Sequence, residues 1–177
     1  MGKMKTAETK DVLVFDFGKR FVRISHIDVS RPGHPQMIHF SKAVLPEEAA
    51  LEEKKEALRA KLPPFDPKFP PEVKVTWEEG IVFRQVVLPD MPDADLKKAL
   101  QWELREKYFL NEDENLIGSE CAMSLAHPDG ATEKFFSVFY CDKKAATEKI
   151  GLVTALGLQV SALVPGQAAL AQVLGNF

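Results

Sequence analysis

The pattern of apolar and polar positions predicts three short strands at the start of the chain. Residues 11–17, "DVLVFDF", are almost continuously apolar, which is typical of a strand buried on both faces. Residues 20–28 alternate less strictly and predict a second strand, and Gly18 marks a tight turn between the two. Residues 36–42, "QMIHFSK", predict a third strand after a loop.

A helix and a proline-rich loop are predicted next. Residues 46–61 have Pro46 in the first turn, acidic side chains early and basic side chains late, as the helix dipole favours. Residues 61–71 contain five prolines, so they form a stiff loop that excludes a helix. Residues 72–77, "EVKVTW", predict a fourth strand.

The central part of the chain changes from a strand period to a helix period. Residues 81–88 predict a strand, and Pro92, Asp93 and Asp95 mark the start of a helix. Apolar and aromatic side chains then recur at every fourth position, at Leu96, Leu100, Leu104 and Tyr108.

Two more strands, 116–126 and 133–141, are predicted around Asp129-Gly130. Residues 142–156 read as a helix that Asp142 caps and Gly157 ends.

The last elements are a strand over 158–164 and a helix that starts at Pro165. The whole pattern predicts a mixed α/β fold, and residues 81–156 form a self-contained block.

Composition excludes several classes of protein. The chain has 177 residues, of which 45% are hydrophobic and 28% charged, as in ordinary globular proteins. Its net charge of −3 argues against a nucleic-acid-binding protein. No apolar run is long enough to span a membrane, and no secretory signal is recognisable, so no direct membrane span is expected.

The cysteines and histidines do not indicate a metal site. Cys121 and Cys141 fall on the two strands around Asp129-Gly130, and two buried thiols are expected in preference to a disulfide. The four histidines have no zinc spacing with each other or with the cysteines. No Ser-His-Asp, Cys-His or paired-carboxylate arrangement stands out, so no catalytic residue is assigned.

Three stretches carry a resemblance to a known family. "DFGKRFVRI" resembles the first phosphate motif of the actin-like ATPase superfamily. "VVLPDMPDADLKKALQWELREKYF" resembles a motif of the PilM family of type IV pilus assembly proteins, and it is the most specific of the three. "FFSVFYCDKKAATEKIGLVTALGLQVSALVPGQAALAQVL" is similar to the run that follows in that family.

The resemblance implies an actin-like, ribonuclease H-like architecture. A subdomain called 1A would hold residues 1–78 and 158–177. An inserted, SHS2-like β-α-β-β-α subdomain called 1C would hold residues 79–157.

The resemblance also implies a partner and a location. Members of this family hold the cytosolic tail of an inner-membrane protein, PilN, in the cleft between 1A and 1C. They are cytoplasmic and peripheral to the inner membrane. Contacts are expected from strand 20–28, from strand 81–88 and from the following helix start, and a second copy of the chain is a further expected partner. The expected partner-binding residues are Arg23, Arg84, Met91, Trp102 and Glu103.

The turn at residues 16–20 has two alternative interpretations, a phosphate site and a simple hairpin. If nucleotide binds, the contacts are Asp16, Gly18, Lys19 and Arg20; otherwise the turn is a hairpin with a solvated basic pair. The family places Ser or Thr where this chain has Lys19, Arg20 and Phe21. It also continues beyond the position of Phe177 into a half with a second phosphate loop. No cofactor is therefore expected for this chain, and ATP with Mg²⁺ only in a longer protein.

Two side-chain assignments have alternatives. Trp102 with Phe109 either forms an edge that faces a partner or packs between the helix and its sheet. Glu103 either ties subdomain 1C to another surface or forms a surface pair with Lys107.

Three functions are consistent with these observations. The first is a PilM-like scaffold that binds a partner's tail. The second is an actin-like ATPase that requires a missing half, and the third is the related cytosolic L-type domain of a type II secretion system.

Overall fold

The computed structural model describes residues 11–31 and 33–166, which form parts of two compact units. The larger unit combines residues up to 79 with those from 148 onward, and the smaller unit holds residues 80–147. The sequence analysis set the limits of the insertion at 79 and 157. That these segments are separate subdomains stays a prediction.

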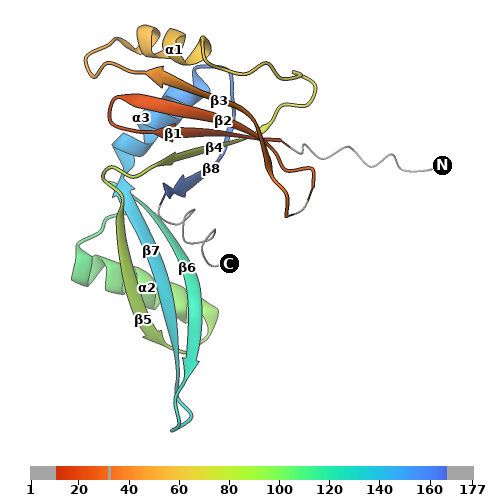
Figure 1. Cartoon of the computed structure of the whole chain (residues 1–177). Coiled ribbons are helices and arrows are strands. Elements are labelled where there is room, and N and C mark those ends of the chain that lie inside the picture. The colour runs from red at the N-terminus through yellow and green to blue at the C-terminus, as the bar shows by residue number, and fades with distance from the viewer. Residues whose placement is uncertain (1–10, 32, 167–177) are drawn as a thin grey trace, which may run out of the picture. The chain divides into compact units, whose positions relative to one another are not determined.

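The larger unit contains a mixed five-stranded sheet in the order β3-β2-β1-β4-β8 (Figure 1). Its strands are β1 (Asp11–Phe17), β2 (Phe21–Asp28), β3 (Gln36–Val44), β4 (Glu72–Trp77) and β8 (Val160–Pro165). β2 is antiparallel to both β1 and β3, and β4 is parallel to both β1 and β8. The predicted hairpin at Gly18 is therefore present.

One face of this sheet is the core of the larger unit. Alternate residues of β1, β2 and β4 point to the same face, as strand geometry requires. The buried side chains of this stripe are Leu13, Phe15, Phe17, Val22, Ile24, Val73, Val75 and Trp77. The opposite face of β1 is only half-buried, so the prediction that β1 is buried on both faces is wrong.

Helix α1 (Leu51–Arg59) begins later than predicted. Pro46 accepts a hydrogen bond from the N–H of Ala49 in a separate turn, and Ala50 is the N-cap residue. The Glu53 carboxylate accepts a hydrogen bond from the Ala50 N–H at 3.0 Å, which fixes the start of the helix there. The prediction of a helix from residue 46 is therefore wrong by one turn. Leu58 is fully buried and anchors α1 to the core.

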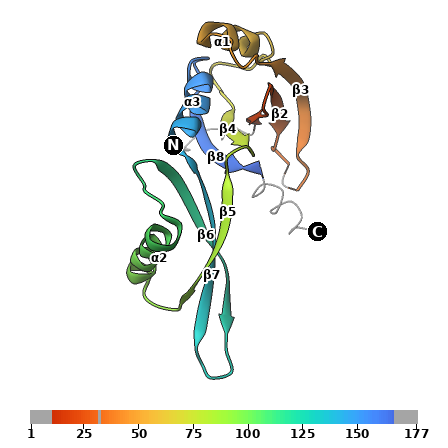
Figure 2. The same ribbon diagram turned by 90° about the vertical axis from the view of Figure 1, so that its left-hand side faces the viewer.

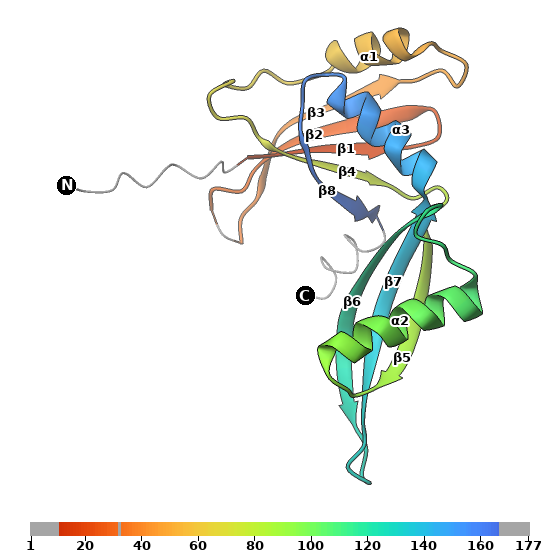
Figure 3. The ribbon, with the colours of Figure 1, turned by 180° about the vertical axis from the view of Figure 1, so that it is seen from behind.

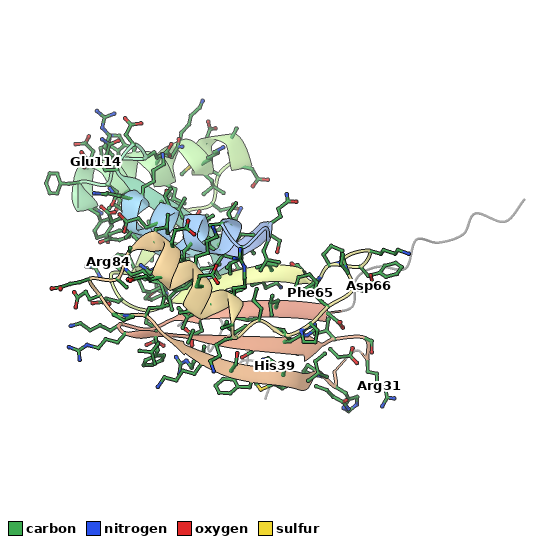
Figure 4. The ribbon with its side chains drawn as sticks, turned by 90° about the horizontal axis from the view of Figure 1, so that it is seen from above. Arg31, His39, Phe65, Asp66, Arg84 and Glu114 are labelled. Carbon is green, nitrogen blue, oxygen red and sulfur yellow. The ribbon has the colours of Figure 1, made fainter. Side chains whose placement is uncertain are left out.

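The proline-rich loop after α1 is ordered by local hydrogen bonds. The Asp66 carboxylate accepts a hydrogen bond from the N–H of Lys68, and the Asp66 carbonyl accepts one from the N–H of Phe69. Phe65 and Asp66 lie in this loop (Figure 4). These turns agree with a stiff loop rather than a flexible linker.

Helix α3 (Lys143–Thr154) follows β7 in the chain (Figure 3). Both of its ends carry the caps that the sequence predicts. The Asp142 carboxylate accepts a hydrogen bond from the N–H of Ala145 at 2.7 Å. Gly157 ends the following turn with a φ of +85°, a conformation that glycine adopts without strain.

The last strand also differs from its prediction. Pro165 is the last residue of β8, and the helix begins one residue later than predicted, at Gly166. The helix predicted from this point lies outside the described residues, apart from Gly166.

The smaller unit is a three-stranded antiparallel sheet with a helix on one face (Figure 2). Its elements in chain order are β5 (Val82–Pro89), α2 (Asp93–Tyr108), β6 (Asn115–Ala126) and β7 (Thr132–Asp142), and the sheet order is β5-β7-β6. The predicted mixed α/β fold class is confirmed.

The predicted ladder of α2 packs on this sheet. Leu96, Leu100 and Leu104 are buried in one cluster, and Tyr108 packs against that cluster. The other buried members are Val86, Leu88, Leu110 and Val138.

Truncation of a leucine in this ladder should lower the stability of the smaller unit. We expect Leu100→Ala to lower the free energy of unfolding by about 2–4 kcal/mol, because a buried leucine is replaced by a cavity. The matched control is Trp102→Ala on the same helix, which should change it by less than about 0.5 kcal/mol since Trp102 is exposed. Chemical denaturation of both variants measures the difference, and equal losses would contradict this packing.

Candidate functional site

The turn between β1 and β2 is built around the ring of Phe21. The N–H of Gly18 donates a hydrogen bond to the Phe21 carbonyl at 2.9 Å. A Cβ at Gly18 would lie 3.0 Å from the Phe21 ring, so any larger residue would force this ring to shift. The Lys42 ammonium lies 4.0 Å from the centre of the same ring.

The predicted phosphate residues come together only in part. Asp16, Gly18 and Lys19 line one shallow hollow of about 340 Å³, whereas Arg20 is not among its lining residues. The remaining lining residues are Phe17, Arg23, Glu78 and Glu79.

The charges of this hollow do not favour a phosphate group. Asp16 and Arg23 are opposite each other in the β1–β2 register, and their side chains form an ion pair at 2.5 Å. Three carboxylates and two cations line the hollow, so its net charge is negative by one. Phosphate sites require cations or backbone N–H groups that outweigh nearby acids. Arg23, which is expected to bind a partner, forms this ion pair within the chain, and its role in partner binding stays a prediction.

Two expected partner-binding residues of the smaller unit have internal contacts. Met91 packs against the core cluster of this unit. Glu103 forms the predicted ion pair with Lys107, and this hydrogen bond raises the pKa of Lys107. Both observations account for these residues without a partner, and their role in binding stays a prediction.

The loop that holds Met91 is attached to β7. Lys134 on β7 donates a hydrogen bond to the Asp90 carboxylate at 2.9 Å, and this bond raises the pKa of Lys134. The N–H of Asp90 also donates to the carbonyl of Thr132. The connection between β5 and α2 is therefore held at two points.

Trp102 and Phe109 do not pack on the sheet. Trp102 is 63% exposed and Phe109 is 86% exposed. The interpretation that they pack between helix and sheet is therefore wrong, because the leucine ladder occupies the face of α2 that meets the sheet. The alternative, an edge that faces a partner, stays open.

The strand order decides which strands can accept an added strand. β2 is paired on both sides, so the expected contact strand 20–28 has no available backbone edge. β5, which covers all but the first residue of the expected strand 81–88, is an edge strand of its sheet. Arg84 on β5 is exposed, and its guanidinium lies 5.9 Å from the centre of the Tyr108 ring.

The sequence analysis missed the apolar face of the smaller sheet that is turned away from α2. Its exposed large side chains are Phe83, Val87, Leu116, Met123 and Leu125. The sequence signal for this face was the two pairs of consecutive aromatic residues, Phe135-Phe136 and Phe139-Tyr140. Neighbouring residues of a strand point to opposite faces, so these pairs place aromatic side chains on both faces of β7. Nothing in the described part of the chain shows what covers this face.

The cysteines and the acidic residues form no metal site within the described residues. Cys141 is buried as predicted, but Cys121 is exposed, so that prediction is wrong. Cys121 lies near the middle of the β6–β7 pairing, opposite Phe136, whereas Cys141 lies near one end, opposite Leu116. In residues 11–31 and 33–166, no helix is long and apolar enough to cross a bilayer.

Comparison with solved structures identifies chains that have the same fold. A chain of the "PilM-PilN type IV pilus biogenesis complex" matches with a TM-score of 0.60 and 15% identity, over 88% of this chain and 46% of that one. The cytoplasmic domain of EpsL, an inner membrane component of the type II secretion system of Vibrio cholerae, matches with a TM-score of 0.53 and 13% identity, over 86% and 56%. A Bacteroides thetaiotaomicron protein of unknown function with an actin-like ATPase fold matches with a TM-score of 0.46 and 10% identity, over 96% and 57%.

These likenesses confirm the PilM-like fold that was recognised from the sequence. The chain spans about half the length of the solved chains it matches. No family model matches the sequence, and comparison with curated proteins gave no match.

The charge of the β1–β2 hollow leads to a prediction about nucleotide. We expect calorimetric titration with ATP and Mg²⁺ to detect no binding in the micromolar range, because the hollow carries more carboxylates than cations. Asp16→Ala should leave this result unchanged and lower stability by less than about 1 kcal/mol, since the Asp16–Arg23 pair is partly exposed. Micromolar binding that Asp16→Ala abolishes would instead identify the turn as a working phosphate site.

Proposed function

We propose that this chain is a PilM-like scaffold of pilus or secretion assembly that binds the cytosolic tail of a PilN-like inner-membrane protein. The observation that carries the proposal is the likeness over 88% of the chain to a chain of the PilM-PilN complex. In this proposal the chain is cytoplasmic and reaches the inner membrane only through its partner. In this proposal the smaller unit, whose elements have the order β-α-β-β, is the counterpart of the SHS2-like insertion 1C.

The β5 edge is the site that we propose for the tail. An extended peptide can add to a sheet edge through main-chain hydrogen bonds, and side chains beside the edge then provide specificity. Phe83 and Val87 are exposed apolar side chains on β5, suited to contact an added strand.

Irregularities in the other edge strands favour β5. The register between β5 and β7 is unbroken from Val82 to Pro89. Each of the other three edge strands of the described sheets contains one residue without a register partner: Ile38 in β3, Ala122 in β6 and Ser161 in β8. Such bulges disturb an edge and oppose strand addition.

The type II secretion reading remains the second candidate. The likeness to the cytoplasmic domain of EpsL supports it, with a TM-score of 0.53. The two candidates share a scaffold role and differ in the partner, so titration with tails from each system separates them. No cofactor forms part of the proposal for this chain, and ATP with Mg²⁺ belongs only to a longer protein with a second phosphate loop.

A calorimetric titration with the tail peptide of the PilN-like protein from the same organism tests the proposal. We expect micromolar binding that Val87→Lys weakens at least about tenfold, because a charged side chain on an edge strand opposes strand addition. Met123→Lys is the matched control, since it lies on the opposite edge strand of the same sheet with a similar exposed fraction, 52% against 42% for Val87. This control should leave the affinity unchanged.

N-methylated peptides separate the site from the function. In an added strand, alternate N–H groups point toward the sheet, so methylation of one alternate set should abolish binding and methylation of the other set should not. Equal effects of the two methylated peptides, or of the two lysine variants, would refute the β5 site but not the scaffold role. Absence of binding at high micromolar concentration would refute the scaffold role.

A further inference from the structure

Two of the most exposed aromatic side chains lie in the C-terminal half of α2 and at its end. Trp102 lies on the side of the helix opposite the buried leucines at positions 96, 100 and 104. Phe109 is the C-cap residue, seven positions further along the chain. Among the described residues, neither aromatic side chain takes part in a ring–ring or cation–π contact.

The backbone holds Phe109 in this exposed position. Phe109 ends α2 in the left-handed conformation, with φ of 54° and ψ of 31°, where glycine is the usual residue. Its N–H donates to the carbonyl of Leu104, and the next residue, Leu110, is buried in the core. The turn is therefore fixed, while the Phe109 ring contributes little to the packing of the unit. An exposed ring at a position that favours glycine has no explanation within the fold.

A hollow of about 760 Å³ lies beside Phe109 at the C-terminal end of α2. Its lining residues are Gln101, Arg105, Glu106, Phe109, Leu110, Asn111, Glu112 and Asp113. The Gln101 side chain donates a hydrogen bond to the Glu112 carboxylate at 3.0 Å, so the loop is tied back to the helix. The wall of the hollow is therefore formed before any ligand arrives.

The hollow and its rim are negatively charged. The lining contains three carboxylates, Glu106, Glu112 and Asp113, against one cation, Arg105. Glu114 follows on the same loop (Figure 4), and the Lys143 ammonium contacts the Glu112 carbonyl at 3.1 Å. With these two residues included, four carboxylates face two cations. The negative end of the α2 dipole adds to this potential.

We infer that the C-terminal end of α2 is a docking surface for a partner segment that carries both cationic and apolar side chains. Phe109 and Trp102 supply aromatic contact area, which commonly anchors interfaces. The carboxylates around the hollow select a basic partner and disfavour an acidic one. An anionic membrane surface, which also prefers cations, is disfavoured for the same reason. This surface is distinct from the β5 edge, and the inference stands without the proposed scaffold function.

The two tryptophans give a direct readout. Trp77 is 2% exposed, whereas Trp102 is 63% exposed, so quenching by acrylamide reports mainly on Trp102. The probe is a six-residue peptide of alternating lysine and leucine, added to the 177-residue chain. We expect it to protect Trp102 from acrylamide and to bind more weakly as salt is added. Peptides of alternating glutamate and leucine, or lysine and serine, should bind at least tenfold more weakly.

Phe109→Gly tests the aromatic anchor without damage to the fold. Glycine suits the left-handed backbone at this position, so the melting temperature should stay unchanged or rise. Peptide affinity should fall at least tenfold. Phe69→Gly is the matched control, because Phe69 is a 58% exposed phenylalanine in the proline-rich loop of the larger unit, and it should leave the affinity within twofold. Glu106→Gln should weaken binding and reduce its salt dependence.

Several outcomes would overturn the inference. A melting temperature several degrees lower in Phe109→Gly would show that the ring serves the fold. Equal binding of the lysine and glutamate peptides would refute the role of the carboxylates. Loss of binding in Val87→Lys but not in Phe109→Gly would assign the peptide to the β5 edge, and stronger binding to anionic vesicles than to the lysine-leucine peptide would refute a protein partner.

Discussion

The buried stripe across β1, β2 and β4 is the constraint on which the larger unit depends. Leu13 and Phe15 are fully buried at its centre, and β1 is paired on both sides, so all three strands must keep their register. A slip of one residue would turn Val14 and Asp16 into the core and expose the leucine and phenylalanine. The same register places Asp16 directly opposite Arg23 on the other face. The ion pair at the hairpin is therefore a consequence of core packing.

This constraint bears on how the β1–β2 turn can work. An actin-like nucleotide site needs a carboxylate available for a hydrated cation and a turn whose backbone lies open to phosphate. Here Arg23 holds the Asp16 carboxylate, and the Phe21 ring occupies the space beside Gly18. Arg23, together with Phe21 at one of the positions where the family has Ser or Thr, thus closes the turn from both sides. The geometry favours a hairpin that serves folding.

Most of the secondary structure could be predicted from the sequence, because it depends on local patterns. The strand pattern of β1, the leucine ladder of α2 and the caps of α3 each depend on residues that are close together in the sequence. The start of α1 was missed because Glu53 caps Ala50 from inside the helix, and this competes with the signal from Pro46. Exposure of Cys121 was missed because burial depends on which strand is at the edge.

Site residues were harder to predict, since they depend on strand order and on layers. The sequence places Trp102 away from the ladder but cannot tell whether a second layer covers that side of the helix. In the smaller unit the helix has a sheet on one side only, so Trp102 stays exposed. Likewise, nothing in residues 20–28 reveals that β2 is interior. That strand was expected to meet a partner, and its neighbours β1 and β3 occupy both of its edges.

The position of Arg84 explains how the β5 edge stays open. Native edge strands are usually protected by bulges or by a charged side chain on the edge, and β5 has no bulge and one charged residue. The Arg84 guanidinium donates a hydrogen bond to the Phe83 carbonyl at 2.9 Å and lies over the Tyr108 ring. Its charge is therefore directed toward the face covered by α2, and of the β5 backbone groups it occupies the Phe83 carbonyl. Since Tyr108 immediately precedes Phe109, this contact also links the β5 edge to the aromatic end of α2 within one compact unit.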